Sequence, residues 1–317
     1  MTSNSIPKEH NPSSSTCGIT DLNQIAVQDE MPRVSIFQML YNQVDGLEKA
    51  FNATVSQNYP NLEIVFSDDH STDGTYEKLQ GLAAKYDGPH ELILTQNSKN
   101  EGIVGNFNTA AKKTTGALVV QVNGDDVARP YRVSKLVELW RSEPDVMLVS
   151  SLARYVDGDG KELGIHNHRE TTDYDKQLAS VIIEQMVEMG SCNAYDRKIF
   201  EEFGEVPEIA IVEDHVMTMR ARRLGKIRKC DEVLVDVRSG GISWQGESPE
   251  EQAKHLEFNY QSKVTVAKAM CEELKGYKFQ GKWRVVIFNN LMILRDLLGL
   301  RNIPGRYFVE AIIRHRR

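Results

Sequence analysis

The sequence predicts an α/β fold built on a mainly parallel sheet with helices on both faces. Apolar runs of strand length alternate with segments of helical periodicity from residue 33 to about 153. This alternation is typical of parallel strands joined by helical crossovers. Two of the apolar runs end in adjacent acids, Asp68-Asp69 and Asp125-Asp126. Ligands bind open α/β sheets just beyond the carboxyl ends of the strands, so the pattern predicts a ligand site there.

The elements of the first half follow one another at short intervals. Apolar runs predict the strands, and Leu47, Ala50, Phe51 and Val55 illustrate the helical spacing between them. The expected strands are 34–40, 62–67, 91–95, 117–122 and 146–153, and the expected helices are 44–57, 76–86, a segment ending near 113, and 130–141.

The remaining elements are less regular. Residues 157–161 predict a hairpin turn, helices are expected at 175–188, 213–224, 249–275 and 281–299, and a strand is expected at 233–237. The Ser-, Asn- and Thr-rich residues 1–31 predict a disordered N-terminal arm. We therefore expect one domain with halves at 32–153 and 154–248, followed by a helical C-terminal extension at 249–317.

Composition narrows the class of protein. Of 317 residues, 40% are hydrophobic and 26% charged, as in ordinary globular proteins, and the net charge of −7 argues against a nucleic-acid partner. The four cysteines form no CxxC motif, which disfavours a disulfide framework or a zinc site and favours a reducing compartment. No apolar run approaches the roughly 18 residues of a spanning helix, and the N-terminus lacks a signal-peptide pattern. These features predict a cytoplasmic protein.

The paired acids of the first half have a structural and a functional interpretation. Helix capping and turn formation account for Ser71, Asp73 and Gly74, which follow the first pair. They do not explain why Asp68 and Asp69 stand side by side, where their charges repel. Clustered charge at a strand end indicates a functional site.

Five short motifs occur in one order along this part of the chain. They are Val34-Ser35-Ile36 with Tyr41-Asn42, Gln57 to Ile64, Asp68 to Thr75, Asn100-Glu101-Gly102 with Asn108, and Asn123-Gly124-Asp125-Asp126 with Pro130. Together they resemble the family 2 glycosyltransferases, whose GT-A fold is a Rossmann-like mixed sheet with helices on both faces. The resemblance covers about residues 33–240. It implies that the first half binds a nucleotide sugar and that the second half binds the acceptor and carries the catalytic base.

The resemblance also implies roles for individual residues. Asp69, with Asp68 beside it, would contact the base and ribose of the donor. Asp125, with Asp126 second, would hold the Mn²⁺ or Mg²⁺ that bridges the diphosphate. An amide, Asn123, replaces the first acid of the family's Asp-x-Asp element. The further expected donor-binding residues are Met39, Tyr41, Asn100, Gly102, Asn123, Gly124 and Arg238. The alternative for residues 123–126 is a solvated turn that leads into a helix.

A second pair of acids, Glu213-Asp214, opens a helix in the second half. By resemblance, Asp214 is the expected catalytic base, which takes a proton from the acceptor hydroxyl, and Glu213 is the reserve. The alternative is that both acids only favour the helix N-terminus. The residues expected to contact the acceptor are Gly190, Ser191 and Trp244.

We therefore expect an inverting, non-processive glycosyltransferase of polysaccharide biosynthesis. It would move one sugar from a nucleotide sugar, taken to be a UDP-sugar, to a glycan or lipid-linked acceptor. The processive Gln-x-x-Arg-Trp motif is missing, since Gln245-Gly246 follow Trp244. The Arg-rich residues 295–317 suit either peripheral contact with the inner face of a membrane or a packed amphipathic helix.

Two other functions remain open at this point. A nucleotidyltransferase also uses paired acids and a metal, but residues 34–42 lack its Gly-rich, basic phosphate loop. A non-catalytic nucleotide-sugar-binding or scaffold protein is favoured by Asn123 and Met39, which depart from the family's pattern.

Overall fold

The computed structural model describes residues 31–166, 189–238 and six positions between 258 and 269. The chain divides into two units, Met1–Met31 and Pro32–Arg317, and every element below belongs to the second. The expected helices at 175–188 and 281–299, most of that at 249–275, Trp244, the Arg-rich residues 295–317 and nearly all of the N-terminal arm lie outside the described residues.

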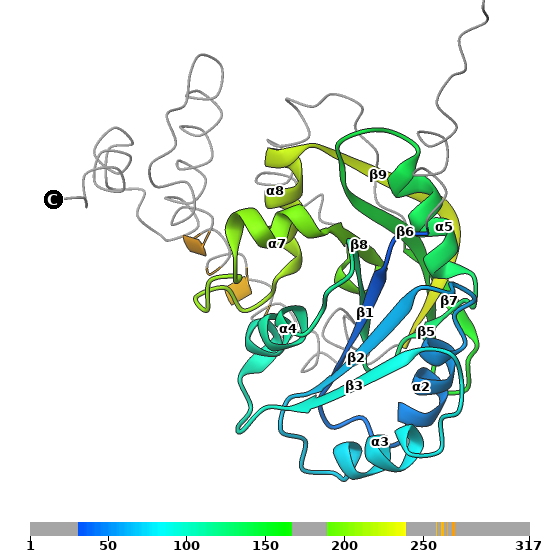
Figure 1. The fold of residues 1–317 in the computed structure, drawn as a ribbon. Coiled ribbons are helices and arrows are strands. Elements are labelled where there is room, and N and C mark those ends of the chain that lie inside the picture. Colours follow the sequence, from blue (N-terminus) through cyan, green and yellow to red (C-terminus); the bar gives the residue numbers. More distant parts are fainter. Residues whose placement is uncertain are drawn as a thin grey trace, which may run out of the picture. The chain divides into compact units, whose positions relative to one another are not determined.

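Within the described residues, one nine-stranded sheet has the order β3-β2-β1-β4-β8-β6-β9-β5, with β7 paired to β6 (Figure 1). The strands are β1 Val34–Leu40, β2 Leu62–Asp68, β3 Glu91–Gln96, β4 Leu118–Asn123, β5 Val127–Ala128, β6 Val146–Val156, β7 Glu162–His166, β8 Asn193–Asp196 and β9 Lys226–Arg238. The helices are α2 Leu47–Val55, α3 Thr75–Ala83, α4 Gly102–Lys112, α5 Arg132–Arg141, the 3-10 turn η2 Gly190–Cys192, α7 Arg197–Phe203 and α8 Asp214–Leu224.

The sheet is mixed, but most of its strands point the same way. β1, β2, β3 and β4 are parallel to one another, and β6 is parallel to β9. The short strand β8 runs antiparallel to both β4 and β6, so those two strands also share a direction. As a result, the carboxyl ends of six strands lie along one edge, and η2 joins that edge because it directly precedes β8.

Helices cover both faces of the sheet, as the sequence predicted. One core packs side chains of α2, α3 and α5 against one face, and a second core packs α4, α7 and α8 against the other (Figure 1). Phe51 stacks on Phe66 in the first core, and Phe37 meets Phe107 edge-on in the second. Each such buried side chain contributes about 1.5–3 kcal/mol.

Glu63 fastens the amino end of the sheet. Its carboxylate is 1% exposed, accepts hydrogen bonds from Ser35 and from the backbone N–H of Thr115 and Gly116, and binds Arg33 at 2.6 Å. Burial opposes ionisation, but the hydrogen bonds outweigh it and lower the pKa of Glu63 to about 2. One ionised side chain therefore ties β1, β2 and the segment that enters β4.

The elements that the sequence missed are short or polar. β5 has two residues and β8 has four, so neither contains an apolar run. The expected strand at 233–237 is the end of β9, which begins at Lys226. The start of β9 is half-exposed, and Lys226 and Arg228 bind Glu143 there at 3.0 and 2.6 Å. The hairpin turn is confirmed by the Asp157–Lys161 backbone bond between β6 and β7.

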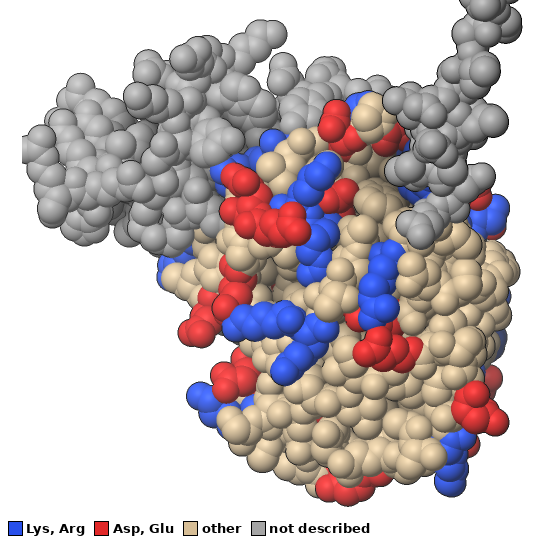
Figure 2. All heavy atoms as spheres, in the orientation of Figure 1, with Lys and Arg blue, Asp and Glu red and all other residues tan. Residues whose placement is uncertain are grey.

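Basic and acidic side chains are interspersed over the described part of the face in Figure 2. Two ion pairs, Lys112–Glu205 at 2.7 Å and Lys135–Glu232 at 2.9 Å, illustrate this pairing. Interspersed charge produces only a weak long-range field. In the described residues, no helix combines the length and apolar character required to cross a membrane.

Candidate functional site

The carboxyl ends of the central strands bring the predicted donor-binding residues together. Met39 of β1 pairs with Ser67 of β2 on one side and with Asn123 of β4 on the other. The acidic segment that follows β2 and the turn that follows β4 therefore emerge on either side of β1. Tyr41 lies just past the end of β1 and is 47% exposed.

Asp68 holds the turn after β2. One carboxylate oxygen accepts the Ser71 hydroxyl at 2.5 Å, and the other accepts the Ser71 backbone N–H at 3.0 Å and the Gln96 amide at 2.9 Å. The side chain is fully buried. The structure thus gives Asp68 an internal role that offsets its proximity to Asp69.

Asp69 binds the start of α4. Its carboxylate accepts the backbone N–H groups of Glu101 and Gly102 at 2.8 and 2.9 Å and the Asn97 amide at 2.7 Å. A carboxylate at a helix N-terminus is favoured by the helix dipole. Gly102 has a positive φ of 75°, and Asn100 accepts the same Gly102 N–H. These contacts give Asn100 and Gly102 a structural role in the turn that opens α4, and any donor contact would be additional.

The turn from Asn123 to Asp126 is packed closely against β1. A Cβ on Gly124 would lie 2.8 Å from the Met39 carbonyl oxygen, so only glycine fits. The buried Gln38 amide donates to the Gly124 carbonyl at 3.2 Å, which explains why a polar residue stands inside β1. Asp126 N–H returns to the Asn123 carbonyl at 3.2 Å. These contacts therefore hold the turn in place against β1.

Asp125 and Asp126 are both held in an environment that disfavours their charge. Burial raises the pKa of Asp125, and the charge of Arg238 opposes this rise. Burial, and then the charge of Asp125, raise the pKa of Asp126 to about 7. One Asp126 oxygen, Oδ2, is buried without a hydrogen-bond partner. A buried acceptor of this kind costs about 1–3 kcal/mol unless a ligand satisfies it.

These two carboxylates fit a divalent cation. Mg²⁺ is commonly held by one or two carboxylates together with substrate phosphates, and a bound cation reverses pKa shifts of this sign. The described residues contain no group of three or more His, Cys, Asp or Glu able to hold a metal. Asp125 and Asp126 would therefore need oxygens from a ligand to complete the coordination.

Arg132 links β4, just before this turn, to η2. It is fully buried, and its Nη2 donates to the carbonyls of Gln121 at 3.0 Å and Ser191 at 2.6 Å. Burial lowers its pKa to about 10, against the opposing effect of Asp126 and other neighbours. Sequence reasoning missed Arg132, although the signal was present: a charged residue on the apolar stripe that continues at Leu136.

The η2 turn lies between the two pairs of acids. A Cβ on Gly190 would lie 2.6 Å from Gln121 Nε2 and 2.7 Å from Glu213 Oε1, so the turn passes directly over that contact. Its neighbour Ser191 lies close enough to Asp126 to lower the pKa of the Asp126 carboxyl. The structure therefore places the predicted acceptor-side residues Gly190 and Ser191 next to both acid pairs.

Glu213 and Asp214 differ in their surroundings. Glu213 is 5% exposed and accepts the Gln121 amide at 2.5 Å. Burial, and then the charge of Asp214, raise the pKa of Glu213 to about 7. Asp214 is 26% exposed, and its Oδ1 accepts the His215 backbone N–H and contacts His215 Nδ1, each at 2.8 Å. The side chain of Glu213, the N-cap residue, does not cap α8, so helix capping does not explain it.

Arg238, at the end of β9, reaches the same turn from the other half of the domain. A Cβ on Gly46 would lie 3.3 Å from Arg238 Nη1 and 3.6 Å from the Cβ of Asp125. The guanidinium is exposed and adjacent to the acidic turn. It is therefore placed to meet an anion held there.

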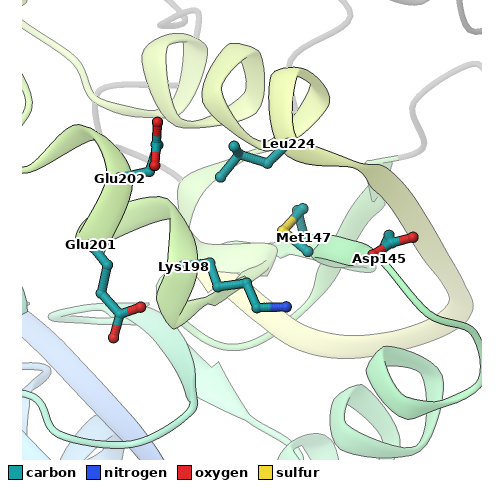
Figure 3. Close-up of a pocket in the computed structure, with 6 residues that line it drawn as sticks. All are labelled: Asp145, Met147, Lys198, Glu201, Glu202 and Leu224. Atoms are coloured by element: carbon teal, nitrogen blue, oxygen red, sulfur yellow. The ribbon is translucent and has the colours of Figure 1, made fainter.

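A separate cavity of about 320 Å³ lies between α7, α8 and the start of β6 (Figure 3). Its lining residues are Asp145, Met147, Lys198, Glu201, Glu202 and Leu224. β6 and β9 begin here, so the cavity is at the amino edge of the sheet, opposite the acidic turn. It does not belong to the candidate site.

Comparisons with known proteins identify the family of the chain. A family model described as glycosyl transferase family 2 matches residues 35–204. An uncharacterized glycosyltransferase of Nostoc sp. is 26% identical over 217 residues, which cover 67% of this chain and 66% of that protein. A Campylobacter jejuni GalNAc(5)-diNAcBac-PP-undecaprenol beta-1,3-glucosyltransferase is 33% identical over 108 residues, 34% of each chain. The chain spans about a third to two thirds of the length of several such relatives.

Solved structures share the fold. The mannosyltransferase PcManGT from Pyrobaculum calidifontis, solved with GDP-Man and Mn²⁺, has a TM-score of 0.54 at 19% identity over 90% of this chain and 87% of its own. S. aureus TarS 1-349 with UDP-GlcNAc has a TM-score of 0.55 at 17% identity over 89% of this chain and 84% of its own. The fold of this chain is accordingly the GT-A type that the sequence predicted.

Proposed function

Because the chain belongs to glycosyl transferase family 2, we propose that it transfers one sugar from a nucleotide-sugar donor to an acceptor hydroxyl, with inversion at the anomeric carbon. The observation that carries this proposal is the position of η2 between the Asp125-Asp126 turn and the Glu213-Asp214 pair. The donor diphosphate and the acceptor hydroxyl would then meet next to η2.

Asp125 and Asp126 would hold Mn²⁺ or Mg²⁺, and the unpartnered Asp126 oxygen supports this role. A bound divalent cation would stabilise the negative charge that grows on the leaving diphosphate. Arg238 would bind a further phosphate oxygen from the opposite side. The complexes of the two solved relatives, one with GDP-Man and Mn²⁺ and one with UDP-GlcNAc, support a nucleotide-sugar donor. We propose a UDP-sugar, with Met39, Tyr41, Asp69, Asn100, Gly102 and Asn123 near its nucleoside.

Asp214 would act as the base. Its partial exposure leaves it accessible to an acceptor, whereas Glu213 is enclosed by Gln121 and Gly190. The acceptor hydroxyl would lose its proton to the Asp214 carboxylate as its oxygen bonds to the anomeric carbon. The bond from that carbon to the diphosphate would break at the same time, and the nucleoside diphosphate would leave. Glu213 is the reserve for this role.

The acceptor is proposed to be a glycan or a lipid-linked glycan. The name of the Campylobacter jejuni relative includes an undecaprenol-linked acceptor, which supports the second class. Single-sugar transfer, a cytoplasmic location and contact with the inner face of a membrane are parts of the same proposal. A binding protein without turnover is the second candidate, because an amide, Asn123, stands where the family has an acid.

A panel of nucleotide sugars with Mn²⁺ should be screened first for a rise in melting temperature, since a ligand of the native state stabilises it. The donor found in this way then enters a transfer assay with wild type, Asp214→Asn and the exposed control Asp231→Asn. We expect Asp214→Asn to lose at least about 100-fold in turnover and to keep the donor-induced shift. Wild-type binding without turnover on any acceptor would favour the binding-protein function, and full turnover by Asp214→Asn would remove the assigned base.

A further inference from the structure

Three buried polar side chains form a line of hydrogen bonds that ends on Glu213. Asn193 Nδ2 donates to the Tyr195 hydroxyl at 3.1 Å, Tyr195 donates to Gln121 Oε1 at 3.0 Å, and Gln121 Nε2 donates to Glu213 Oε1 at 2.5 Å. Asn193, Tyr195 and Gln121 are each fully buried. The line crosses the sheet from β8 to β4 and reaches α8.

The direction of this line follows from its chemistry. Burial, and then the charge of Glu213, raise the pKa of Tyr195 well above 10, so its hydroxyl keeps its proton. Because that oxygen already receives the Asn193 amide, its proton is given to Gln121 Oε1. The Gln121 carboxamide is thereby prevented from turning over, and its N–H can only face Glu213.

We propose that Gln121 is a positioning residue of the acceptor-side acids: locked by Tyr195, it holds the Glu213 carboxylate in one place beside Asp214. This inference rests on the proposed glycosyl transfer. Sequence reasoning did not single out Gln121 or Tyr195, and neither side chain would touch the donor or the acceptor.

The charged and titratable groups around Glu213 set the sign of the effect. Asp214 disfavours its negative charge, while His215 and the Gln121 amide favour it. Tyr195 from β8 remains neutral, and Cys192 from η2 contributes to raising the pKa of that hydroxyl. Without the Gln121 amide, this hydrogen bond no longer offsets the effects of burial and of the Asp214 charge on Glu213. The pKa of Glu213 should then increase.

The test compares Gln121→Met and Tyr195→Phe with two matched controls. Gln57→Met removes a buried amide that donates to the Ala53 and Arg129 carbonyls, and Tyr59→Phe removes a buried hydroxyl that donates to the Pro32 carbonyl. Both controls remove hydrogen bonds of the same kind outside the line that ends on Glu213, although Gln57 also accepts the Val133 backbone N–H of α5 at 3.1 Å. The full chain with Mn²⁺ is used throughout.

For Gln121→Met we expect kcat to be at least about tenfold lower with donor KM little changed, because the Glu213 carboxylate is no longer held beside Asp214. Tyr195→Phe should lower kcat by less, because the amide is still present but free to turn. Both controls should keep the wild-type kcat and donor KM. An unchanged kcat in both Gln121→Met and Tyr195→Phe, or equal losses in the controls, would overturn the proposal.

A second measurement separates this proposal from the proposed function. In protein labelled with ¹³C at the glutamate carboxyl, Glu213→Gln identifies the Glu213 signal, and its titration is followed in wild type, Gln121→Met and Tyr195→Phe. A higher titration midpoint in either variant supports the positioning role even if no nucleotide sugar is turned over. Identical midpoints refute that role even if the wild type is an active transferase.

Discussion

Replacement of Glu63 by Gln should destabilise the protein in a way that depends on pH. The pKa of the folded-state carboxyl is about 2, against the 4.5 that is ordinary for a glutamate, and each pKa unit corresponds to about 1.4 kcal/mol. The ionised form therefore contributes about 3 kcal/mol at pH 7, an upper value because the partner Arg33 is 41% exposed. Since the folded pKa is depressed, this contribution is complete above pH 4.5 and is lost as the pH falls toward 2.

The assay is urea unfolding of wild type and Glu63→Gln at pH 7, 5, 4 and 3. Linkage predicts that the difference in unfolding free energy decreases by about 2 kcal/mol between pH 7 and pH 3. The matched control is Glu91→Gln, which removes the other carboxylate bound to Arg33. Because Glu91 is 58% exposed, its loss should cost less than about 1 kcal/mol. A difference for Glu63→Gln that stays constant from pH 7 to pH 3 would refute the argument.

Three further predictions concern the site. Gly190→Ala should disturb the Gln121–Glu213 contact and reduce turnover at least about tenfold, whereas Gly81→Ala, with open space around it, should not; equal turnover of both would contradict this. Asp126→Asn should abolish the rise in melting temperature caused by Mn²⁺ without destabilising the metal-free protein, and an unchanged Mn²⁺ effect would exclude Asp126 as a ligand. Asp69→Asn should destabilise the donor-free protein by about 1 kcal/mol, because it weakens the contact with α4. A stability equal to wild type in urea would leave only a donor role.

The sequence predicted the first half of the fold well for a physical reason. β1, β2 and β4 are buried on both faces and so appear as mostly apolar runs, which the sequence displays directly. β8 has four residues, begins with Asn193 and ends with Asp196, and pairs on both sides with longer strands, which supply its stability. Tertiary contacts of this kind leave no local pattern.

The same distinction applies to the site. Asp125, Asp126, Glu213 and Asp214 were recognisable because acids at element ends form a motif, and the structure brings both pairs to η2. Gln121 lies inside an apolar strand, where a polar residue is itself a signal. Its partner was not predictable, because Glu213 is 92 residues away in sequence.

The two acid pairs of the first half, Asp68-Asp69 and Asp125-Asp126, look alike in the sequence but differ in their hydrogen bonds. All four carboxylate oxygens of Asp68 and Asp69 accept at least one hydrogen bond from the protein, so these acids stabilise the fold without any ligand. Asp126 keeps one buried oxygen without a partner, although burial already disfavours its charge. A buried carboxylate in this state is stabilised further when a proton or a cation arrives. Ligand binding should therefore stabilise the folded protein more at the turn after β4 than at the turn after β2.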